Sequence, residues 1–194
     1  MLEDKFIDIN GAKIHYIESG SGIPVIMCHG ARFNARTYED SGTIKAVDDA
    51  GFRPISIDFP GYCKSENMNI GLSTFIADFI DAMHLEPGVV LGASMGGEAV
   101  TGFAVKNPDK YIALILVGAV GVSAYKDSLP VIQDKPLLLI WGKNDAISQP
   151  ENYELLEQYS KNYKFYNVGR QHACYLDDAV EFNARIVEFL KTIK

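Results

Sequence analysis

The sequence of 194 residues predicts an α/β fold with a mostly parallel, twisted sheet and helices on both faces. The first reason is that short apolar runs alternate along the chain with segments in which apolar residues recur at helical spacing. The second is a glycine-flanked serine, Gly92-Ala93-Ser94-Met95-Gly96, which stands between a buried strand and a helix. The third is Asn10-Gly11, a hairpin turn that predicts an antiparallel pair of strands at the start of the sheet.

Each predicted strand is a short apolar or alternating run that turn residues bound. The strands cover 4–9, 13–18, 24–28, 53–57, 89–91, 111–117, 136–141 and 163–168. Helical spacing predicts helices over about 37–50, 72–84, the stretch from Ser94 to Asn107-Pro108, 150–160 and 177–192. The last helix is expected to be capped by Asp177 or Asp178. Residues 118–134 are expected to be irregular or to form at most a short helix.

No internal repeat, low-complexity tract or interdomain linker interrupts the chain, so residues 1–194 are expected to form a single domain. Hydrophobic residues make up 47% and charged residues 22%, as in an ordinary soluble globular protein. The net charge is −7, from 25 acidic and 18 basic residues, and no block of Lys or Arg is present. This charge pattern argues against nucleic acid or an anionic membrane as the main partner.

The longest apolar run, 111–122, is too short to cross a bilayer, and the first residues lack the basic and apolar regions of a signal peptide. The three cysteines, Cys28, Cys63 and Cys174, form neither a metal-spaced pair nor an even disulfide framework. Each is expected to be a small packing residue. These features predict a protein of the reducing cytoplasm that uses no metal and no cofactor.

Ser94 has the sequence context of a nucleophile elbow. Gly92 and Gly96 lack the side chains that would keep strand and helix apart, so the serine can sit in a strained turn above the sheet. The following helix aims free N–H groups and a positive dipole end at charge that forms beside the hydroxyl. The bare pattern arises by chance in about one chain in ten of this length. The alternative is a tight turn whose serine merely caps the helix.

Further reactive groups follow other predicted strands, at the edge where open α/β sheets bind ligands. A serine hydroxyl needs a base to remove its proton, and His172 can serve because imidazole titrates near neutral pH. Asp145 would fix the tautomer of that imidazole and stabilise the imidazolium. The backbone N–H groups of Met95 and of Ala31, directly after His29-Gly30, are the expected donors to an oxyanion.

The remaining histidines are expected to serve the structure. His15 alternates on a hairpin strand and His84 ends a helix, so both are expected at the surface or as caps. His29 follows a buried strand and is expected to shape the oxyanion loop around Gly30 by hydrogen bonds. Asp58 also follows a strand and is a rival to Asp145, but its strand precedes the serine.

Four other side chains lie near the predicted site. Arg32 stands beside the oxyanion loop and is a candidate contact for an anionic substrate, with an ordinary surface or salt-bridged role as the alternative. Tyr62, Tyr125 and Tyr175 are candidates for the rim of the pocket, and packing is the simpler expectation for each.

Five stretches together carry a resemblance to a known family: His29-Gly30-Ala31-Arg32-Phe33, residues 58–65, residues 92–97, residues 141–145 and Gly169-Arg170-Gln171-His172. In these stretches the chain resembles the α/β-hydrolase-fold superfamily. Within it, the chain is most similar to the small lidless group of abhydrolase-domain-containing protein 14. The resemblance implies Ser94, Asp145 and His172 as the catalytic triad, in the chain order of that superfamily, with Ala31 and Met95 as oxyanion donors.

The chain departs from the superfamily pattern in two stretches. Cys63 replaces the second glycine of a D-x-P-G-x-G-x-S turn, and Arg170-Gln171 precede His172 where small residues are common. Its length is also informative, because about 18 residues connect the strands 111–117 and 136–141, where superfamily members usually insert a helical lid. We therefore expect no lid and an exposed, shallow site that suits small or short-chain acyl groups.

Three functions remain open. The leading one is a serine carboxylesterase that acts on a small-molecule acyl ester through an acyl-enzyme on Ser94. The resemblance adds an acyltransferase that passes an acetyl group from lysine to coenzyme A, although no glycine loop or basic cluster for coenzyme A is visible. The third is an interaction module without catalysis. The sequence does not predict the oligomeric state.

Overall fold

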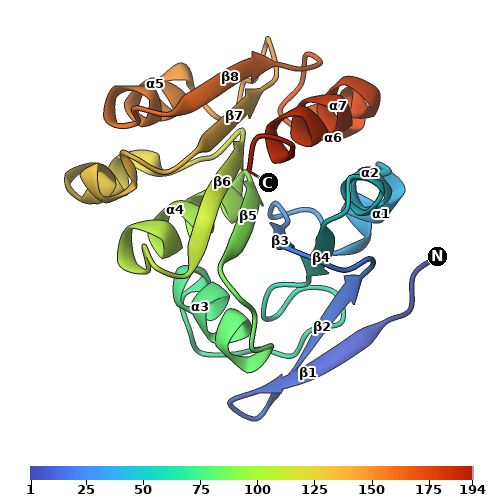
Figure 1. The fold of residues 1–194 in the computed structure, drawn as a ribbon. Helices are drawn as coiled ribbons and strands as arrows, with labels where there is room; N and C mark the ends of the chain where they lie inside the picture. Colours follow the sequence, from blue (N-terminus) through green and yellow to red (C-terminus); the bar gives the residue numbers. More distant parts are fainter. Residues whose placement is uncertain (194) are drawn as a thin grey trace.

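The computed structural model describes residues 1–193, and in it eight strands form one twisted sheet in the order β1-β2-β4-β3-β5-β6-β7-β8 (Figure 1). The pairs β1/β2 and β2/β4 are antiparallel, and all other pairs are parallel. The strands are β1 (Lys5–Ile9), β2 (Ala12–Glu18), β3 (Pro24–Cys28), β4 (Arg53–Ile57), β5 (Gly88–Ala93), β6 (Tyr111–Val117), β7 (Leu137–Trp141) and β8 (Tyr163–Asn167). The predicted sheet is therefore confirmed.

The antiparallel edge depends on the turn between β1 and β2. Asn10 and Gly11 both have positive φ, at 53° and 86°, which is the pairing that a two-residue hairpin of matching twist requires. The pairing Ile9↔Ala12 closes the hairpin, and β2 then lies beside β4. This arrangement brings residues of β2 next to the segment that follows β4.

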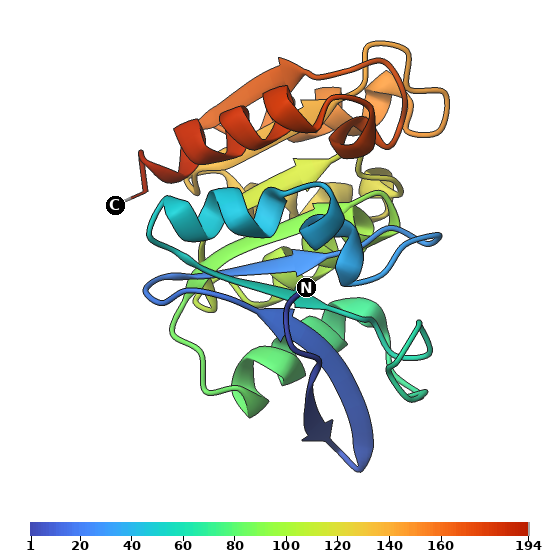
Figure 2. The same cartoon turned by 90° about the vertical axis from the view of Figure 1, so that its right-hand side faces the viewer.

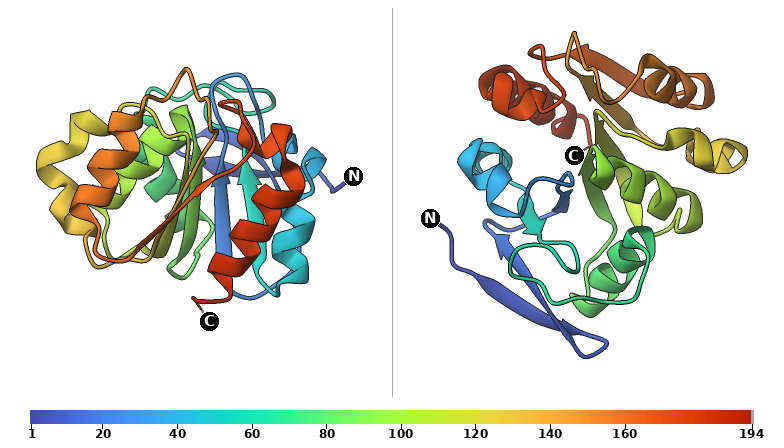
Figure 3. Two further views of the ribbon diagram at one scale, coloured as in Figure 1. Left: turned by 90° about the horizontal axis from the view of Figure 1, so that it is seen from above. Right: turned by 180° about the vertical axis from the view of Figure 1, so that it is seen from behind.

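Helices cover both faces of the sheet, as Figure 2 and the view from above in Figure 3 show. On one face lie α3 (Leu72–Ala82), α4 (Met95–Lys106), the 3₁₀ helix η1 (Val122–Ile132) and α5 (Pro150–Tyr159). On the other lie α1 (Arg36–Asp40), α2 (Thr43–Asp49), α6 (Cys174–Asp177) and α7 (Ala179–Leu190). The molecule therefore has three layers, with the sheet in the middle.

Successive residues of the central strands enter two separate apolar cores. Val90 and Leu139 belong to the core under α3, α4 and α5, whereas Leu91 and Leu138 belong to the core under α2 and α7. Strands β3, β5 and β7 are buried along their whole length. A strand covered on both faces has this continuous apolar pattern, which is why the sequence identified these strands readily.

One helical prediction is wrong, and the structure decides between the alternatives of two others. The helix expected over 37–50 is divided into α1 and α2, because Gly42 has a φ of 74° that no helix interior accommodates. The stretch 118–134, expected to be irregular or to form at most a short helix, contains the 3₁₀ helix η1. The last helix begins at Ala179 with Asp178 as its cap, since the Asp178 side chain accepts a hydrogen bond from the Glu181 N–H.

The parallel pairing places the carboxyl ends of six strands at one edge. Cys28 of β3 pairs with Gly92 of β5, and Trp141 of β7 pairs with Asn167 of β8, so the loops that follow these strands meet. Between β6 and β7 the chain forms η1 and no separate lid within residues 1–193. Across the same residues, no helix combines the length and the apolar character that crossing a bilayer requires.

Candidate active site

Ser94 occupies a sharp turn between β5 and α4. Its φ of 54° and ψ of −116° lie outside the regions that L-residues ordinarily adopt. The turn is tight enough to exclude side chains on either side. A Cβ on Gly92 would lie 2.3 Å from the Gly96 carbonyl oxygen, and a Cβ on Gly96 would lie 2.5 Å from the Cys28 carbonyl oxygen. Both glycines are therefore required by contact.

The serine does not cap helix α4 through its side chain. The Ser94 side chain makes no capping hydrogen bond, whereas its backbone is held at both ends: its N–H donates to the Val117 carbonyl at 2.9 Å and its carbonyl accepts from the Glu98 N–H at 3.1 Å. The hydroxyl is thus left for other contacts, at the N-terminal end of a helix of 12 residues.

His172 and Asp145 form a hydrogen-bonded pair. The His172 Nδ1 lies 2.8 Å from Asp145 Oδ2 and 2.9 Å from Oδ1. The carboxylate is itself fixed, because its Oδ1 accepts the N–H groups of Ile147 and Ser148 at 2.9 Å each. Since a carboxylate only accepts, Nδ1 donates to it, and in the neutral ring Nε2 then carries the lone pair. The side chain of Asp145 is 2% exposed.

The two loops that carry this pair are joined by their backbones. The Asn144 N–H donates to the Arg170 carbonyl at 2.8 Å, and a Cβ on Gly142 would lie 2.1 Å from the Gln171 carbonyl oxygen. The loop of His172 is also held by Asp177, which accepts hydrogen bonds from the N–H groups of Arg170 and, at 3.2 Å, Gln171. These two bonds hold the pKa of Asp177 below its ordinary value. Asp177 therefore fixes this loop, and of the two candidate caps of the last helix only Asp178 serves as the cap.

One glycine of the site is not marked by any motif in the sequence. Gly118 follows β6 with a φ of 48°, and a Cβ there would lie 3.1 Å from both Asp145 Oδ2 and His172 Nδ1. A side chain at this position would push against the carboxylate–imidazole pair. The only sequence signal is a glycine directly after a buried strand, and glycine at this position also occurs in ordinary turns that are not part of a site.

Ser94 and His172 line one pocket of about 410 Å³ at the carboxyl edge of the sheet. The other lining residues are Gly30, Ala31, Arg32, Phe33, Ile147, Gln171 and Ala173. The Nε2 atom of His172 is buried and has no hydrogen-bond partner within the part of the chain that the structure describes. The serine hydroxyl and this free nitrogen thus belong to the same cavity, although the structure shows no hydrogen bond between them.

The loop after β3 forms another wall of the pocket. A Cβ on Gly30 would lie 3.3 Å from the Ser94 Cβ, so the loop passes directly beside the serine. His29 holds this loop by two hydrogen bonds: its Nε2 accepts the Phe59 N–H at 3.1 Å and its Nδ1 donates to the Gly30 carbonyl at 2.8 Å. Burial lowers the pKa of His29 below its ordinary value, which favours this neutral ring.

Arg32 lies on the exposed part of this loop and lines the pocket. Among residues 1–193 it has no ion-pair or hydrogen-bond partner, whereas Arg36, Arg53 and Arg185 are all held by carboxylates. The salt-bridged alternative for Arg32 therefore finds no support. Its guanidinium stands free at the pocket that holds the serine.

The structure also tests the expectations for His15, for the cysteines and for His84. The expectation that His15 lies at the surface is wrong: it is 1% exposed and lies between Asp4, across the hairpin, and Asp58, 43 residues away in sequence. Cys63 is exposed and therefore not a packing residue, whereas Cys28 and Cys174 are buried as expected. His84 is exposed just after α3, in agreement with its expected place.

The three tyrosines serve packing. Tyr175 is buried against Phe33, with ring centroids 5.7 Å apart. The Tyr62 hydroxyl lies 3.1 Å from the Met95 sulfur, and Tyr125 lies over Gly102. None of them lines the pocket of Ser94.

The fold and these motifs are those of one family. The sequence profile of the α/β hydrolase fold matches residues 23–131, more than half of the chain. The chain belongs to the α/β hydrolase fold family. Among its relatives in this family is the human putative protein-lysine deacylase ABHD14B, which is 26% identical over 200 residues, covering 97% of this chain and 95% of its own. The chain thus resembles the abhydrolase-domain-containing 14 group along nearly its whole length.

Solved structures of α/β hydrolases share this architecture. The crystal structure of a predicted CIB-like hydrolase from Thermoplasma acidophilum has a TM-score of 0.93 at 23% identity and covers 99% of both chains. An esterase from Exiguobacterium antarcticum has a TM-score of 0.85 at 21% identity and covers 97% of this chain and 100% of its own. At these identities the likeness concerns the fold. Together with the family membership, the relatives support a hydrolase.

Proposed function

We propose that the protein is a serine hydrolase that cleaves acyl esters, with Ser94 as nucleophile, His172 as general base and Asp145 as the residue that orients the base. The observation that carries the proposal is a single pocket. It contains a serine on a strained turn and the free Nε2 of an imidazole whose Nδ1 is held by a buried carboxylate.

The first half of the reaction follows from these positions. Ser94 Oγ attacks the carbonyl carbon of the ester while His172 Nε2 takes the hydroxyl proton. The resulting oxyanion accepts hydrogen bonds from the backbone N–H groups of Met95 and Ala31. When the tetrahedral intermediate collapses, the bond to the alcohol breaks and His172 returns the proton to the leaving oxygen. The product is an acyl-enzyme and a free alcohol.

The second half repeats this chemistry with water. His172 removes a proton from water as it attacks the acyl carbon, and the proton then passes to Ser94 Oγ as the bond to serine breaks. Catalytic hydrogen bonds are often long in unliganded enzymes and shorten only with substrate, which accounts for a serine and an imidazole that share a pocket without a bond.

The pocket supports a small-molecule ester with a short acyl group as the substrate. The walls contributed by Ala31, Phe33 and Ala173 are apolar, and the connection between β6 and β7 supplies no lid. The free guanidinium of Arg32 supplies a contact for an anionic group at the end of a substrate. Arg32 is therefore the candidate residue for substrate contact.

The test is hydrolysis of p-nitrophenyl acetate by the wild type and by Ser94→Ala, with circular dichroism to show that both are folded. The proposal expects turnover by the wild type and none by the variant, and labelling of the wild type alone by a fluorophosphonate probe. Undiminished turnover by Ser94→Ala rejects the mechanism. A folded wild type that neither turns over esters nor reacts with the probe favours an interaction module instead.

A second candidate is removal of acyl groups from lysine, because relatives covering nearly the whole chain are named putative protein-lysine deacylases. The same acyl-enzyme would form, with the lysine amine as leaving group and either water or the thiol of coenzyme A as acceptor. Mass spectrometry of an acetyl-lysine peptide incubated with the protein, with and without coenzyme A, distinguishes the cases. Release of acetate supports hydrolysis, and formation of acetyl-coenzyme A supports acyl transfer.

A further inference from the structure

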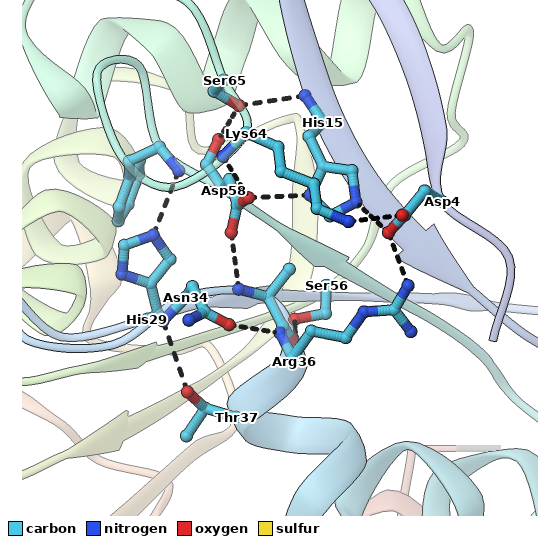
Figure 4. Close-up of polar contacts among 12 residues, drawn as sticks. Asp4, His15, His29, Asn34, Arg36, Thr37, Ser56, Asp58, Lys64 and Ser65 are labelled. Atoms are coloured by element: carbon cyan, nitrogen blue, oxygen red, sulfur yellow. Dashed lines mark hydrogen bonds and ion pairs between the residues drawn. The ribbon is translucent and has the colours of Figure 1, made fainter. Parts of the chain in front are cut away.

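A polar cluster around Asp58 lies beside the end of the loop after β3, next to Asn34 and Arg36 (Figure 4). At its centre are Asp58, which follows β4, and His15 of β2, each 1% exposed. The His15 Nδ1 lies 2.7 Å from Asp58 Oδ2. Neither side chain lines the pocket of Ser94, so the proposed mechanism does not use them directly. A buried carboxylate is costly unless it is fully hydrogen-bonded, and its partners indicate what it does.

The carboxylate of Asp58 accepts hydrogen bonds from three segments. Its Oδ1 accepts the Ala35 N–H at 2.7 Å, and its Oδ2 accepts the Lys64 N–H at 3.1 Å in addition to the His15 ring. Bonds to a charged acceptor are about twice as strong as neutral ones. Asp58 thus connects the end of the loop after β3 to the loop after β4 and to the hairpin.

Ala35 is held from its other side as well. Its carbonyl accepts a hydrogen bond from the Ser56 Oγ at 2.8 Å, and Ala35 is itself fully buried. The opposite end of the loop is fixed by the next residue of the same segment, because the Phe59 N–H donates to His29. Two consecutive residues after β4 therefore fix both ends of the loop, while Ala31 and Arg32 between them are exposed.

His15 is in turn fixed from outside. Its Nε2 lies 2.8 Å from Asp4 Oδ1, and Asp4 also forms ion pairs with Arg36 and Lys64. The contacts with Lys64, then Arg36 and His15, hold the pKa of Asp4 far below its ordinary value. The ring therefore has a hydrogen-bond partner at each nitrogen, so His15 is held in place against Asp58.

We propose that Asp58 is a positioning residue for the oxyanion site: held by His15, it fixes Ala35 and thereby the loop from which the Ala31 N–H meets the developing negative charge. This proposal rests on the proposed esterase mechanism. Asp58 touches neither substrate nor nucleophile, and it acts only through the backbone of the loop. Its loss is expected to lower the rate of the chemical step and to leave ground-state binding nearly unchanged.

The test compares kcat and KM for p-nitrophenyl acetate among Asp58→Asn, His15→Leu and His15→Asn. We expect Asp58→Asn to lower kcat about 10- to 100-fold, the effect typical of a misplaced catalytic group, with little change in KM. His15→Leu should lower kcat in the same direction. His15→Asn should restore most of it, because its side-chain amide can replace Nδ1 as a donor to Asp58.

Thr43→Val is the matched control for a lost buried hydrogen bond. Thr43 is fully buried and donates to Asn183 Oδ1 at 2.7 Å, between α2 and α7, away from the pocket. It should lower the melting temperature without lowering kcat.

Inhibition by a trifluoromethyl ketone, which forms a tetrahedral adduct with the serine, is a second measurement of the same effect. Its inhibition constant should rise in Asp58→Asn by the same factor by which kcat/KM falls.

Amide hydrogen exchange at residues 31–35 separates failure of this proposal from failure of the esterase mechanism. We expect exchange there to accelerate at least about tenfold in Asp58→Asn and His15→Leu, but not in Thr43→Val. If the folded variants keep the kcat and the exchange rates of the wild type, the positioning role is wrong. If Asp58→Asn does not fold, the comparison of His15→Leu with His15→Asn decides instead. If Ser94→Ala retains turnover, the esterase mechanism fails, and the exchange data still decide whether Asp58 fixes the loop.

Discussion

At the scale of single residues, the pocket depends on positions where a side chain would not fit. Gly92 allows β5 and α4 to meet behind Ser94, Gly96 allows α4 to lie against the end of β3, and Gly118 allows the Asp145–His172 pair to approach β6. The first two glycines belong to a local pattern, so the sequence reveals their role. Gly118 meets its neighbours only through folding, because His172 lies more than fifty residues farther along the chain.

Gly118→Ala tests that contact. The new methyl group would meet Asp145 and His172 at 3.1 Å, and the φ of 48° costs an L-residue about 1–2 kcal/mol. We expect a modest loss of stability together with a fall of about tenfold or more in kcat, since the imidazole must shift. Urea unfolding and ester kinetics check both effects. A variant that loses stability but keeps full kcat would show that the pair tolerates displacement.

His29 predicts how stability depends on pH. Burial lowers its pKa in the folded state below the ordinary value of 6.5, so the unfolded chain binds the proton more readily. The contribution of the neutral ring to stability is therefore fully present above pH 6.5, and it is lost as the pH falls through 6.5 toward the lower folded value. Protonation would also oppose the bond from the Phe59 N–H.

His29→Gln is the matching variant, because its amide oxygen can accept the Phe59 N–H and does not titrate. We expect the free energy of unfolding of the wild type to decrease more steeply between pH 6.5 and 5 than that of the variant. Denaturant titrations at several pH values measure both slopes. Equal slopes in this window would contradict the assignment.

At the scale of elements, the site is a meeting of loops that follow parallel strands. The loops after β7 and β8 are joined by backbone hydrogen bonds, and each carries one member of the Asp145–His172 pair. Asp177 at the end of α6 fixes the second loop, whereas its neighbour Asp178 caps α7. Two adjacent carboxylates thus have different tasks.

Substituting each aspartate by alanine separates these tasks. Asp177→Ala should lower kcat, because the backbone N–H groups of Arg170 and Gln171 lose their acceptor and the loop of His172 loosens. Asp178→Ala should cost about 1 kcal/mol of stability through the lost cap and leave kcat nearly unchanged. Ester kinetics and thermal unfolding of both variants give the comparison. Identical effects on kcat would mean that Asp177 does not act through the loop.

The elements also show where sequence reasoning succeeds. Local pattern predicts all eight strands: the fully buried β3, β5 and β7 are continuous apolar runs, and the Asn10-Gly11 turn marks the antiparallel pair β1 and β2. It misses the break between α1 and α2, because a glycine inside a helical pattern does not reveal its φ. It misplaces His15, because an alternating strand does not show that Asp58, 43 residues away, stands beside it. Local signals predict elements, whereas long-range polar partners appear only in the folded chain.

At the scale of the whole molecule, the missing lid sets the expected substrate range. The connection between β6 and β7 is the 3₁₀ helix η1, which packs beside α4 and α5 on one face of the sheet and away from the pocket lining. A site without a lid excludes water poorly and offers little apolar surface to a long acyl chain.

A series of p-nitrophenyl esters from acetate to palmitate tests this expectation. We expect kcat/KM to be highest for the shortest acyl chains and to decrease with length. Half-esters of dicarboxylic acids, assayed with the wild type and Arg32→Gln, show whether the free guanidinium adds affinity for an anionic end. A clear preference for long chains would contradict the open site.

The central claim is that Ser94, His172 and Asp145 act as one unit. The most direct measurement is the rate of labelling by a fluorophosphonate, with the adduct located by mass spectrometry of tryptic peptides. The account predicts an adduct on Ser94 alone and a rate reduced about a thousandfold or more in His172→Ala. Labelling at another residue, or at the wild-type rate without the imidazole, would contradict it.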